Sequence, residues 1–235
     1  MTFEEVMHEL ESLATEQTKK VYRAHGVHEP HWGVPTTAMR SLAKKIKRNQ
    51  PLAEQLYATG NYDAMYFAGM IADPQAMTEA DFDRWMDAAY FFMLSDYVVS
   101  VSLAETAYAQ TVADRWITSG EELRMSAGWA CYEWLLGSRS DDEFDTKKIR
   151  AMLNIAANTI HEQPNRTRYS MNGFVVAVGV SFLPLHEEAL KTAEKIGKVH
   201  VSTEKGACSV PLATDAILKA KDKNRLGFKR KGVRC

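Results

Sequence analysis

The sequence predicts an all-α protein made of short helices stacked in pairs. Prolines, glycines and capping residues divide the 235-residue chain into segments of helical length. Within these segments, apolar residues recur every three or four positions, and no stretch alternates apolar and polar residues between hairpin turns. Helix pairs recur about every forty residues, which is a period typical of α-solenoids. We therefore expect one solenoid domain over residues 1–235.

The first part of the chain predicts four helices. Thr2 and Glu5 form a capping-box pattern before apolar residues at helical spacing, and Gly26 is the expected stop. Pro35 opens the next helix, and a third is closed by Gly60. These helices are expected over residues 2–26, 35–46, 51–60 and 61–72.

The rest of the chain predicts seven more helices. Thr78 with Asp81, Ser95 and Asp145 have the residue types and positions of N-caps, and Gly137 is typical of a helix stop. A very apolar helix follows the break at Pro164 and Asn165, and residues 198–202 have a weak extended pattern. The expected ranges are 78–89, 95–103, 121–136, 145–161, 167–182, 184–197 and a last helix from 211.

Charge is balanced overall and uneven along the chain. The formal net charge is -1, with 46% apolar and 25% charged residues, so composition alone indicates an ordinary globular protein. Two islands are basic, however, and a face of that kind suits phosphate. The alternative is a solvated helix face. The expected DNA contacts in these islands are Arg40, Lys44, Lys45, Lys47 and Arg48, and Lys229, Arg230 and Lys231 in a basic C-terminal tail.

Several classes of protein are disfavoured. The three cysteines, Cys131, Cys208 and Cys235, lack zinc-ligand spacing, which predicts reduced thiols and a cytoplasmic location. The start of the chain does not have a signal-peptide pattern, and the longest apolar run, 174–185, is too short to cross a bilayer, so no membrane partner is expected.

Motifs for cofactor chemistry are also missing from the sequence. It contains no Gly-x-Ser-x-Gly elbow, phosphate-cradling glycine loop or His-Glu-x-x-His string, which disfavours nucleophilic hydrolases, nucleotide cofactors and zinc proteases. His25, His28 and His31 recur every third residue and could bind zinc. They have no clear fourth ligand, so no metal is expected.

Two further groups of residues are candidates for a site. Arg166 and Arg168 follow Pro164, just before a helix N-terminus, where amide groups add positive potential and a phosphate clamp could form. The alternative for both is a surface loop. Asp96 lies among aromatic residues, as a site for a cationic ligand would require, although an acid in a first turn also simply stabilises the helix dipole.

One helix carries an aromatic residue and an acid on the same face. Trp129 and Glu133 are one turn apart and could form a site in which Glu133 acts as the acid. The alternative is a core tryptophan with an acid at its rim, because aromatic residues at helical spacing usually serve packing.

Several strings in the chain resemble the DNA alkylation repair (AlkD-like) family of HEAT-like-repeat proteins. They are GVP at 33–35 with MRSLAKKI at 39–46, SAGWA at 126–130, and GACSVPLA at 206–213 leading to GFKRK at 227–231. The resemblance runs over nearly the whole chain. It implies a right-handed α-α superhelix of HEAT-like repeats that binds double-stranded DNA, in some members alkylated.

The resemblance also implies an activity for some members. Glycosylases of this family excise cationic N3- or N7-alkylpurines, whose glycosidic bond the positive charge already weakens. A carboxylate and aromatic faces then stabilise the oxocarbenium-like sugar. The family's Trp and Asp, four residues apart, fall at Ser95 and Val99 here, so the acid is missing at its expected position.

Other family positions are only partly kept. The family's next-repeat Arg falls near Ser126, with Arg124 two residues away, and a later Trp falls at Phe174, which together with Trp129 would give an aromatic platform. Three hypotheses stay open: a glycosylase using Asp96 or Glu133, a non-catalytic paralogue that binds damaged or branched DNA by shape and charge, and a protein-interaction solenoid.

Overall fold

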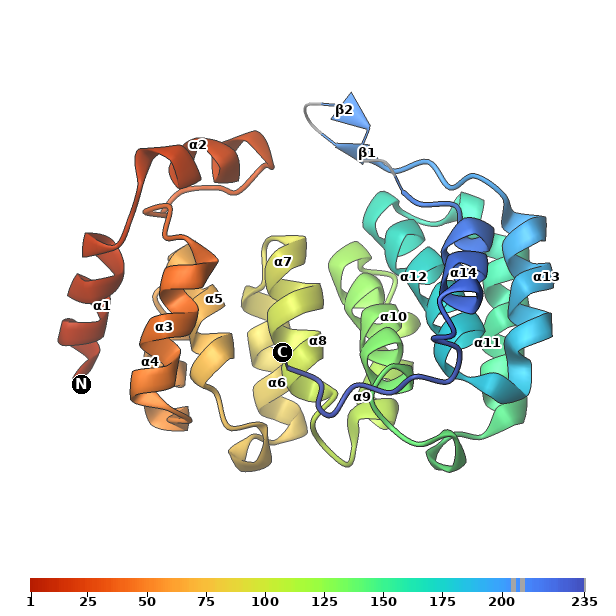
Figure 1. Cartoon of the computed structure of the whole chain (residues 1–235). Coiled ribbons are helices and arrows are strands. Elements are labelled where there is room, and N and C mark those ends of the chain that lie inside the picture. The colour runs from red at the N-terminus through yellow and green to blue at the C-terminus, as the bar shows by residue number, and fades with distance from the viewer. Residues whose placement is uncertain (204–205, 208–209, 235) are drawn as a thin grey trace. The chain divides into compact units, whose positions relative to one another are not determined.

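The computed structural model describes residues 1–203, 206–207 and 210–234. The expected all-α class is confirmed, because helices make up nearly all of the regular structure (Figure 1). The chain forms two compact units, and the expected single solenoid domain over residues 1–235 stays a prediction. Unit 1 is Met1–Thr106 together with Thr203 and Gly206, and unit 2 contains Ala107–Ser202 with residues from Ala207 onward.

Unit 1 is organised around α5 (Tyr62–Ile71), whose residues are nearly all buried. This helix packs against α3, α4 and the segment that contains α7 and η2, and α6 packs against η2. The other elements of unit 1 are α1 (Phe3–Ser12), α2 (Glu16–Ala24), α3 (Thr36–Ile46), α4 (Gln50–Tyr57), the 3₁₀ turn η1 (Pro74–Ala76), α6 (Glu79–Ala88), α7 (Phe92–Leu94), the π-helix η2 (Ser95–Val99) and α8 (Ser100–Leu103).

The first expected helix is in fact two. The capping box of Thr2 and Glu5 is confirmed, but α1 ends at Ser12. Thr15 then caps α2, because its hydroxyl accepts a hydrogen bond from the Thr18 amide at 3.1 Å. A second N-cap signal inside the pattern therefore outweighed the continuous apolar spacing.

Ser95 does not begin a helix as expected. Helical structure starts at Phe92 and runs through the π-helical turn of η2 into α8. The Ser100 hydroxyl donates to the Ser95 carbonyl oxygen at 2.9 Å within this wider turn. Gly69 of α5 makes room for it, since a Cβ at Gly69 would lie 2.6 Å from Cγ1 of Val98.

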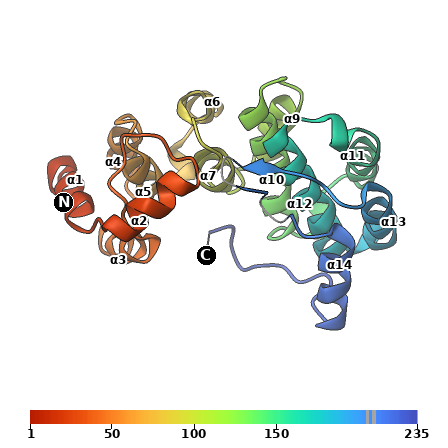
Figure 2. The same ribbon diagram turned by 90° about the horizontal axis from the view of Figure 1, so that it is seen from above.

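Unit 2 is organised around α10 (Glu122–Leu136) and α12 (Asn165–Ser181), which pack against each other. In addition, α10 contacts α9, and α12 contacts α13 and α14 (Figure 2). The other elements in this part of the chain are α9 (Ala109–Ile117), the 3₁₀ turns η3 (Asp141–Glu143), η4 (Ile160–Glu162) and η5 (Leu183–Leu185), α11 (Thr146–Thr159), α13 (His186–Ile196), α14 (Ala213–Asp222) and the paired strands β1 (Ser202–Thr203) and β2 (Gly206–Ala207).

The structure bears on two of the sequence predictions, those on membrane spans and on cysteines. Within the described residues, no single helix has both the length and the apolar character needed to cross a membrane; α12 passes that test only together with Leu183–Ile196, across a bend of 107°. Cys131 is buried and burial raises the pKa of its thiol, while Cys208 and Cys235 lie outside the described residues.

Candidate nucleic-acid interface

A cationic surface of unit 1 lies on α3. Its buried face carries Met39 and Leu42. Four basic side chains on the helix and at its C-cap are exposed, and within the described chain no ion pair neutralises them. We call them the α3 cations: Arg40, Lys44, Lys45 and Lys47. Because their charge is not offset locally, they are available to a polyanion.

Arg48 differs from its neighbours. No acid lies near it in sequence, but the fold brings two: its guanidinium lies 3.3 Å from Oδ1 of Asp73 and 2.7 Å from Oε2 of Glu105. The expectation that Arg48 contacts phosphate therefore loses its main support. A low local density of acids in the sequence does not exclude ion pairs made over long sequence separations.

The backbone path into α3 is set by one buried carboxylate. Asp63 of α5 is fully buried and accepts three backbone hydrogen bonds, from the N–H groups of Trp32 at 2.6 Å, Gly33 at 3.0 Å and Val34 at 2.8 Å. Gly33 has φ +93°, a conformation that favours glycine. The sequence analysis did not single out Asp63, because its partners lie 30 residues away.

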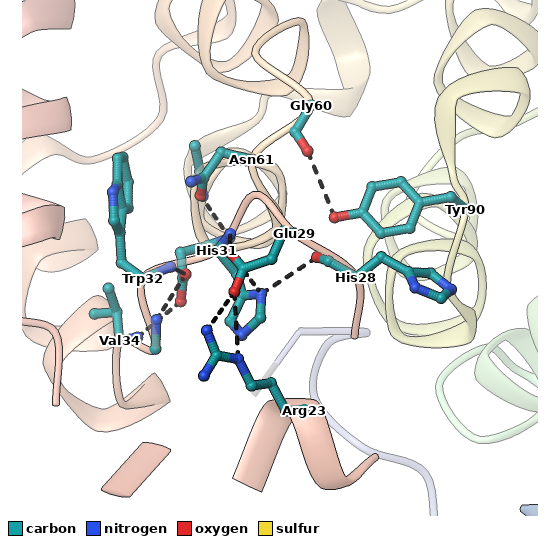
Figure 3. Close-up of polar contacts among 12 residues, drawn as sticks. Arg23, His28, Glu29, His31, Trp32, Val34, Gly60, Asn61 and Tyr90 are labelled. Atoms are coloured by element: carbon teal, nitrogen blue, oxygen red, sulfur yellow. Dashed lines mark hydrogen bonds and ion pairs between the residues drawn. The ribbon is translucent and has the colours of Figure 1, made fainter. Parts of the chain in front are cut away.

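A second polar cluster holds the preceding residues (Figure 3). Glu29 accepts from Arg23 at 2.7 Å and from the His31 amide at 3.1 Å. These two hydrogen bonds, that of Arg23 first, lower the pKa of Glu29 to about 2. The His31 ring is buried, with Nδ1 3.3 Å from the His28 carbonyl oxygen.

The zinc alternative finds no support in this arrangement. Among the described side chains, no three His, Cys, Asp or Glu groups are placed to hold a metal ion. His25 and His28 are exposed, while His31 is inside. The three histidines therefore lie in different environments, two at the surface and one in the interior.

Tyrosines complete the packing of this segment. The Tyr22 hydroxyl donates to the Val34 carbonyl at 2.7 Å, and the Tyr22 and Tyr62 rings meet edge to face at 5.0 Å. Tyr90 approaches the Gly60 carbonyl at 3.5 Å (Figure 3), and burial, with Asp63 and Glu29, raises its pKa to about 12. These contacts order the chain before α3.

The positions that the resemblance assigns to catalysis lie inside unit 1. Ser95 and Val99 are fully buried in η2. Asp96 is only 3% exposed and accepts a hydrogen bond from the Ser95 hydroxyl at 2.8 Å. A carboxylate held this way faces protein rather than a bound sugar.

The expected aromatic platform of unit 2 is part of the core, which is a correction. Trp129 and Phe174 are buried, and their rings pack edge to face at 5.1 Å. Neither ring is open to a base, so the packing alternative holds for both. Glu133 is partly exposed and lies against Gly173, whose missing side chain leaves room for it.

Ser126 is also interior. It is fully buried, and its hydroxyl lies 2.6 Å from that of Ser170. Arg124, two residues away, keeps only 14% of its side chain exposed and donates to Glu121 at 3.1 Å. The buried Ser126 is therefore not open to DNA, and the charge of Arg124 is compensated by Glu121.

Arg166 and Arg168 lie in the first turn of α12 and not in a break before it. The Arg166 amide, expected to face an anion, donates to Oε1 of Glu122 at 2.6 Å. The Arg166 guanidinium lies 4.3 Å from the ring centre of Tyr169. Both arginine side chains are partly exposed, so the N-terminal end of α12 is cationic. The Arg166 amide, however, already donates its hydrogen bond to Glu122.

Two residues of the basic tail contact the C-terminal end of α10. Lys229 donates to the Leu136 carbonyl at 2.8 Å and forms an ion pair with Asp141 at 2.7 Å. Arg230 lies 4.7 Å from the Trp134 ring centre, and its amide donates to the Gly137 carbonyl at 2.8 Å. A helix C-terminus favours such cations. Lys231 is exposed.

These helices define a HEAT-like repeat protein. A solved structure described as "A new family of proteins related to the HEAT-like repeat DNA glycosylases with affinity for branched DNA structures" is 58% identical, with a TM-score of 0.94 and 100% of each chain covered. A model of the family described as "DNA alkylation repair enzyme" matches residues 6–214. The chain belongs to the DNA alkylation repair family.

Two curated relatives cover almost the same length. "Uncharacterized protein Lin0241" of Listeria innocua serovar 6a is 30% identical over 95% of this chain and 99% of its own. "Uncharacterized protein Lmo0209" of Listeria monocytogenes serovar 1/2a is 29% identical over 96% of this chain and 100% of its own.

Proposed function

We propose that this protein binds branched DNA through backbone phosphates and does not excise bases. The observation that carries the proposal is a contrast between candidate groups. The α3 cations are exposed and unneutralised within the described chain, whereas Asp96, Trp129 and Phe174 are buried. Exposed cations suit phosphate binding, which is the main source of affinity for nucleic acids. The solved relative described as having affinity for branched DNA structures supports the choice of ligand.

Base excision needs a carboxylate that is open to the bound sugar. Loss of a cationic alkylpurine leaves positive charge on the sugar, which a carboxylate open to the ligand would stabilise. Ser95 and Val99 stand where the resemblance places the family's Trp and Asp, and Asp96 is hydrogen-bonded in the interior. Glu133, which is partly exposed, is the remaining carboxylate candidate.

A binding titration tests the DNA part of the proposal. Labelled three-way junction and linear duplex of equal base composition are titrated with the protein, and binding is followed by fluorescence anisotropy. We expect tighter binding to the junction, and affinity for both that falls as salt rises. Binding without salt dependence, or none to either DNA, would contradict the proposal and favour the protein-interaction alternative.

A base-release assay tests the catalytic part. DNA that contains 7-methylguanine is incubated with the protein, and free base is measured against a protein-free sample. We expect no release above background. Release that disappears in Glu133→Gln or Asp96→Asn would instead identify a glycosylase and its acid.

A further inference from the structure

The segment after α14 presents a half-exposed aromatic side chain on a fixed backbone. Phe228 is 52% exposed, and Leu183 of η5, which lies against the neighbouring Gly227, is 53% exposed. The Arg225 guanidinium lies 5.0 Å from the centre of the Phe228 ring. We call Leu183, Arg225 and Phe228 the Phe228 patch. An exposed apolar residue is ordinary by itself, so what distinguishes Phe228 is that cations and a second exposed apolar side chain lie near it on an ordered segment.

The backbone on both sides of Phe228 is tied to unit 2. The Gly227 amide donates to the Val180 carbonyl of α12 at 2.8 Å, and the Arg230 amide donates to the Gly137 carbonyl after α10 at 2.8 Å. Gly227 has φ +72°, and a Cβ there would lie 2.9 Å from Cδ1 of Leu183. A side chain at this position would therefore be strained and crowded, and glycine keeps the segment close to Leu183.

The surroundings of the patch are cationic. Residues 221–231 contain six basic residues and one acid, Asp222. Lys229 is neutralised by Asp141, but Lys223, Arg225 and Lys231 are exposed and have no ion pair with a described residue. An aromatic surface edged with cations matches a ligand that combines a flat apolar face with negative charge. A nucleobase at the end of a stack has both properties.

We propose that the Phe228 patch stacks on a base exposed at the branch point of DNA. This inference rests on the proposed function and adds the feature by which a branch is distinguished from a duplex. In a continuous duplex every base is covered on both faces, so Phe228 would gain little contact. A branch point interrupts stacking and leaves base faces open, and base–aromatic stacking then adds affinity.

The patch is a contact separate from the arginines of α12. Arg166 lies in the first turn of that 17-residue helix, and Val180, which holds Gly227, lies in its last turn. The helix is about 25 Å long at 1.5 Å per residue. Loss of Phe228 can therefore be tested without disturbing the Arg166 end.

The test compares Phe228→Ala with the wild type on two DNAs whose arm ends are all closed by the same hairpin loop: a three-way junction with 2-aminopurine at the branch point and a linear duplex with 2-aminopurine at an interior position. We expect Phe228→Ala to weaken junction binding about tenfold, within the range for losing one stacked base, and to leave duplex binding unchanged. Phe228→Tyr keeps the ring and should bind the junction like wild type. Leu218→Ala, which shortens another exposed apolar side chain of unit 2, is the matched control.

The fluorescence signal separates stacking from charge. Wild-type protein should change the emission of the branch-point 2-aminopurine, and Phe228→Ala should abolish that change. Unaltered junction binding by Phe228→Ala, or equal losses on junction and duplex, would overturn the inference while the proposed function stands; the first result would favour an acidic protein partner for the patch. Failure of the wild type to bind either DNA would overturn both. Thermal unfolding of each variant confirms that the fold is kept.

Discussion

At the scale of single residues, Asp63 has the clearest structural role. Its carboxylate satisfies three consecutive amides from a segment 30 residues earlier and so fixes where α3 begins. The α3 cations depend on this position, because the helix that carries them follows directly. Loss of any one of these hydrogen bonds would leave a buried polar group without its partner, which destabilises the fold.

We predict that Asp63→Asn lowers the free energy of unfolding by about 3 kcal/mol, because an amide group both loses charge and places its own donor against backbone N–H groups. Urea denaturation monitored by circular dichroism measures the change. Asp142→Asn, at an exposed position, is the control. If the two variants unfold at the same urea concentration, the anchoring role of Asp63 is wrong.

Glu29 provides a pH-dependent contact in the same region. Its pKa is lowered to about 2, from an ordinary value of 4.5, chiefly by the hydrogen bond from Arg23. A lowered folded-state pKa means that Glu29 contributes to stability above pH 4.5 and that this contribution is lost as the pH falls toward 2.

We predict that Arg23→Gln raises the pKa of Glu29 toward 4.5. An NMR titration of the Glu29 side-chain carboxyl carbon between pH 2 and 6 gives the midpoint. Lys20→Gln removes an exposed charge from the same helix, α2, and should leave the midpoint in place. An unchanged midpoint in Arg23→Gln would mean that another group holds the pKa down.

At the scale of elements, local capping chemistry predicted much of the fold. Thr78 and Asp145 cap α6 and α11 as expected, since the residues concerned lie within one turn. The helix α9 was not predicted, and its N-cap, Tyr108, offers no side-chain hydrogen bond. The π-helix η2 was also missed, because its wider turn accommodates packing against α5 and α6 that no local pattern encodes.

The candidate site was less predictable than the helices for the same reason. The exposed cations of α3 follow from a helical pattern, and the sequence located them. Neutralisation of Arg48 by Glu105 and occupation of the Arg166 amide by Glu122 depend on residues far apart in sequence. Patterns within one segment do not contain such pairings.

Helix packing in unit 2 can be tested with two glycines. A Cβ at Gly128 of α10 would lie 2.8 Å from the Ala113 carbonyl oxygen and 2.9 Å from the Ile117 amide, which are backbone atoms of α9 and its C-terminal end. The three atoms nearest to a Cβ at Gly173 of α12 would all belong to the end of the Glu133 side chain.

We predict that Gly128→Ala destabilises the protein by about 2 kcal/mol, because α9 and α10 must separate. Gly173→Ala should cost less than Gly128→Ala, since alanine favours a helix and the added Cβ meets the end of a side chain instead of backbone. Thermal unfolding of both variants measures the difference. Equal melting temperatures for the two would show that the α9–α10 contact is not tight.

At the scale of the whole molecule, folding changes which charges are available. The formal net charge of -1 conceals the distribution, and ion pairs remove Arg48, Lys229 and Arg150 from the available cations. The α3 cations keep their charge. Because several exposed cations remain on α3, we expect the salt dependence of DNA binding to be shared among several phosphate contacts.

We predict that replacing Arg40, Lys44 and Lys45 together by glutamine makes the slope of log affinity against log salt less negative by about 3, because each phosphate contact contributes about −0.9 to that slope. The measurement is the junction titration at several salt concentrations. A control that replaces the exposed Lys147, Lys191 and Lys198 by glutamine has the same net charge, so it corrects for the overall field of the protein. Only the α3 variant should flatten the slope, since non-contacting lysines release no counterions. Equal slopes in the two triple variants would place the phosphate contacts elsewhere on the chain.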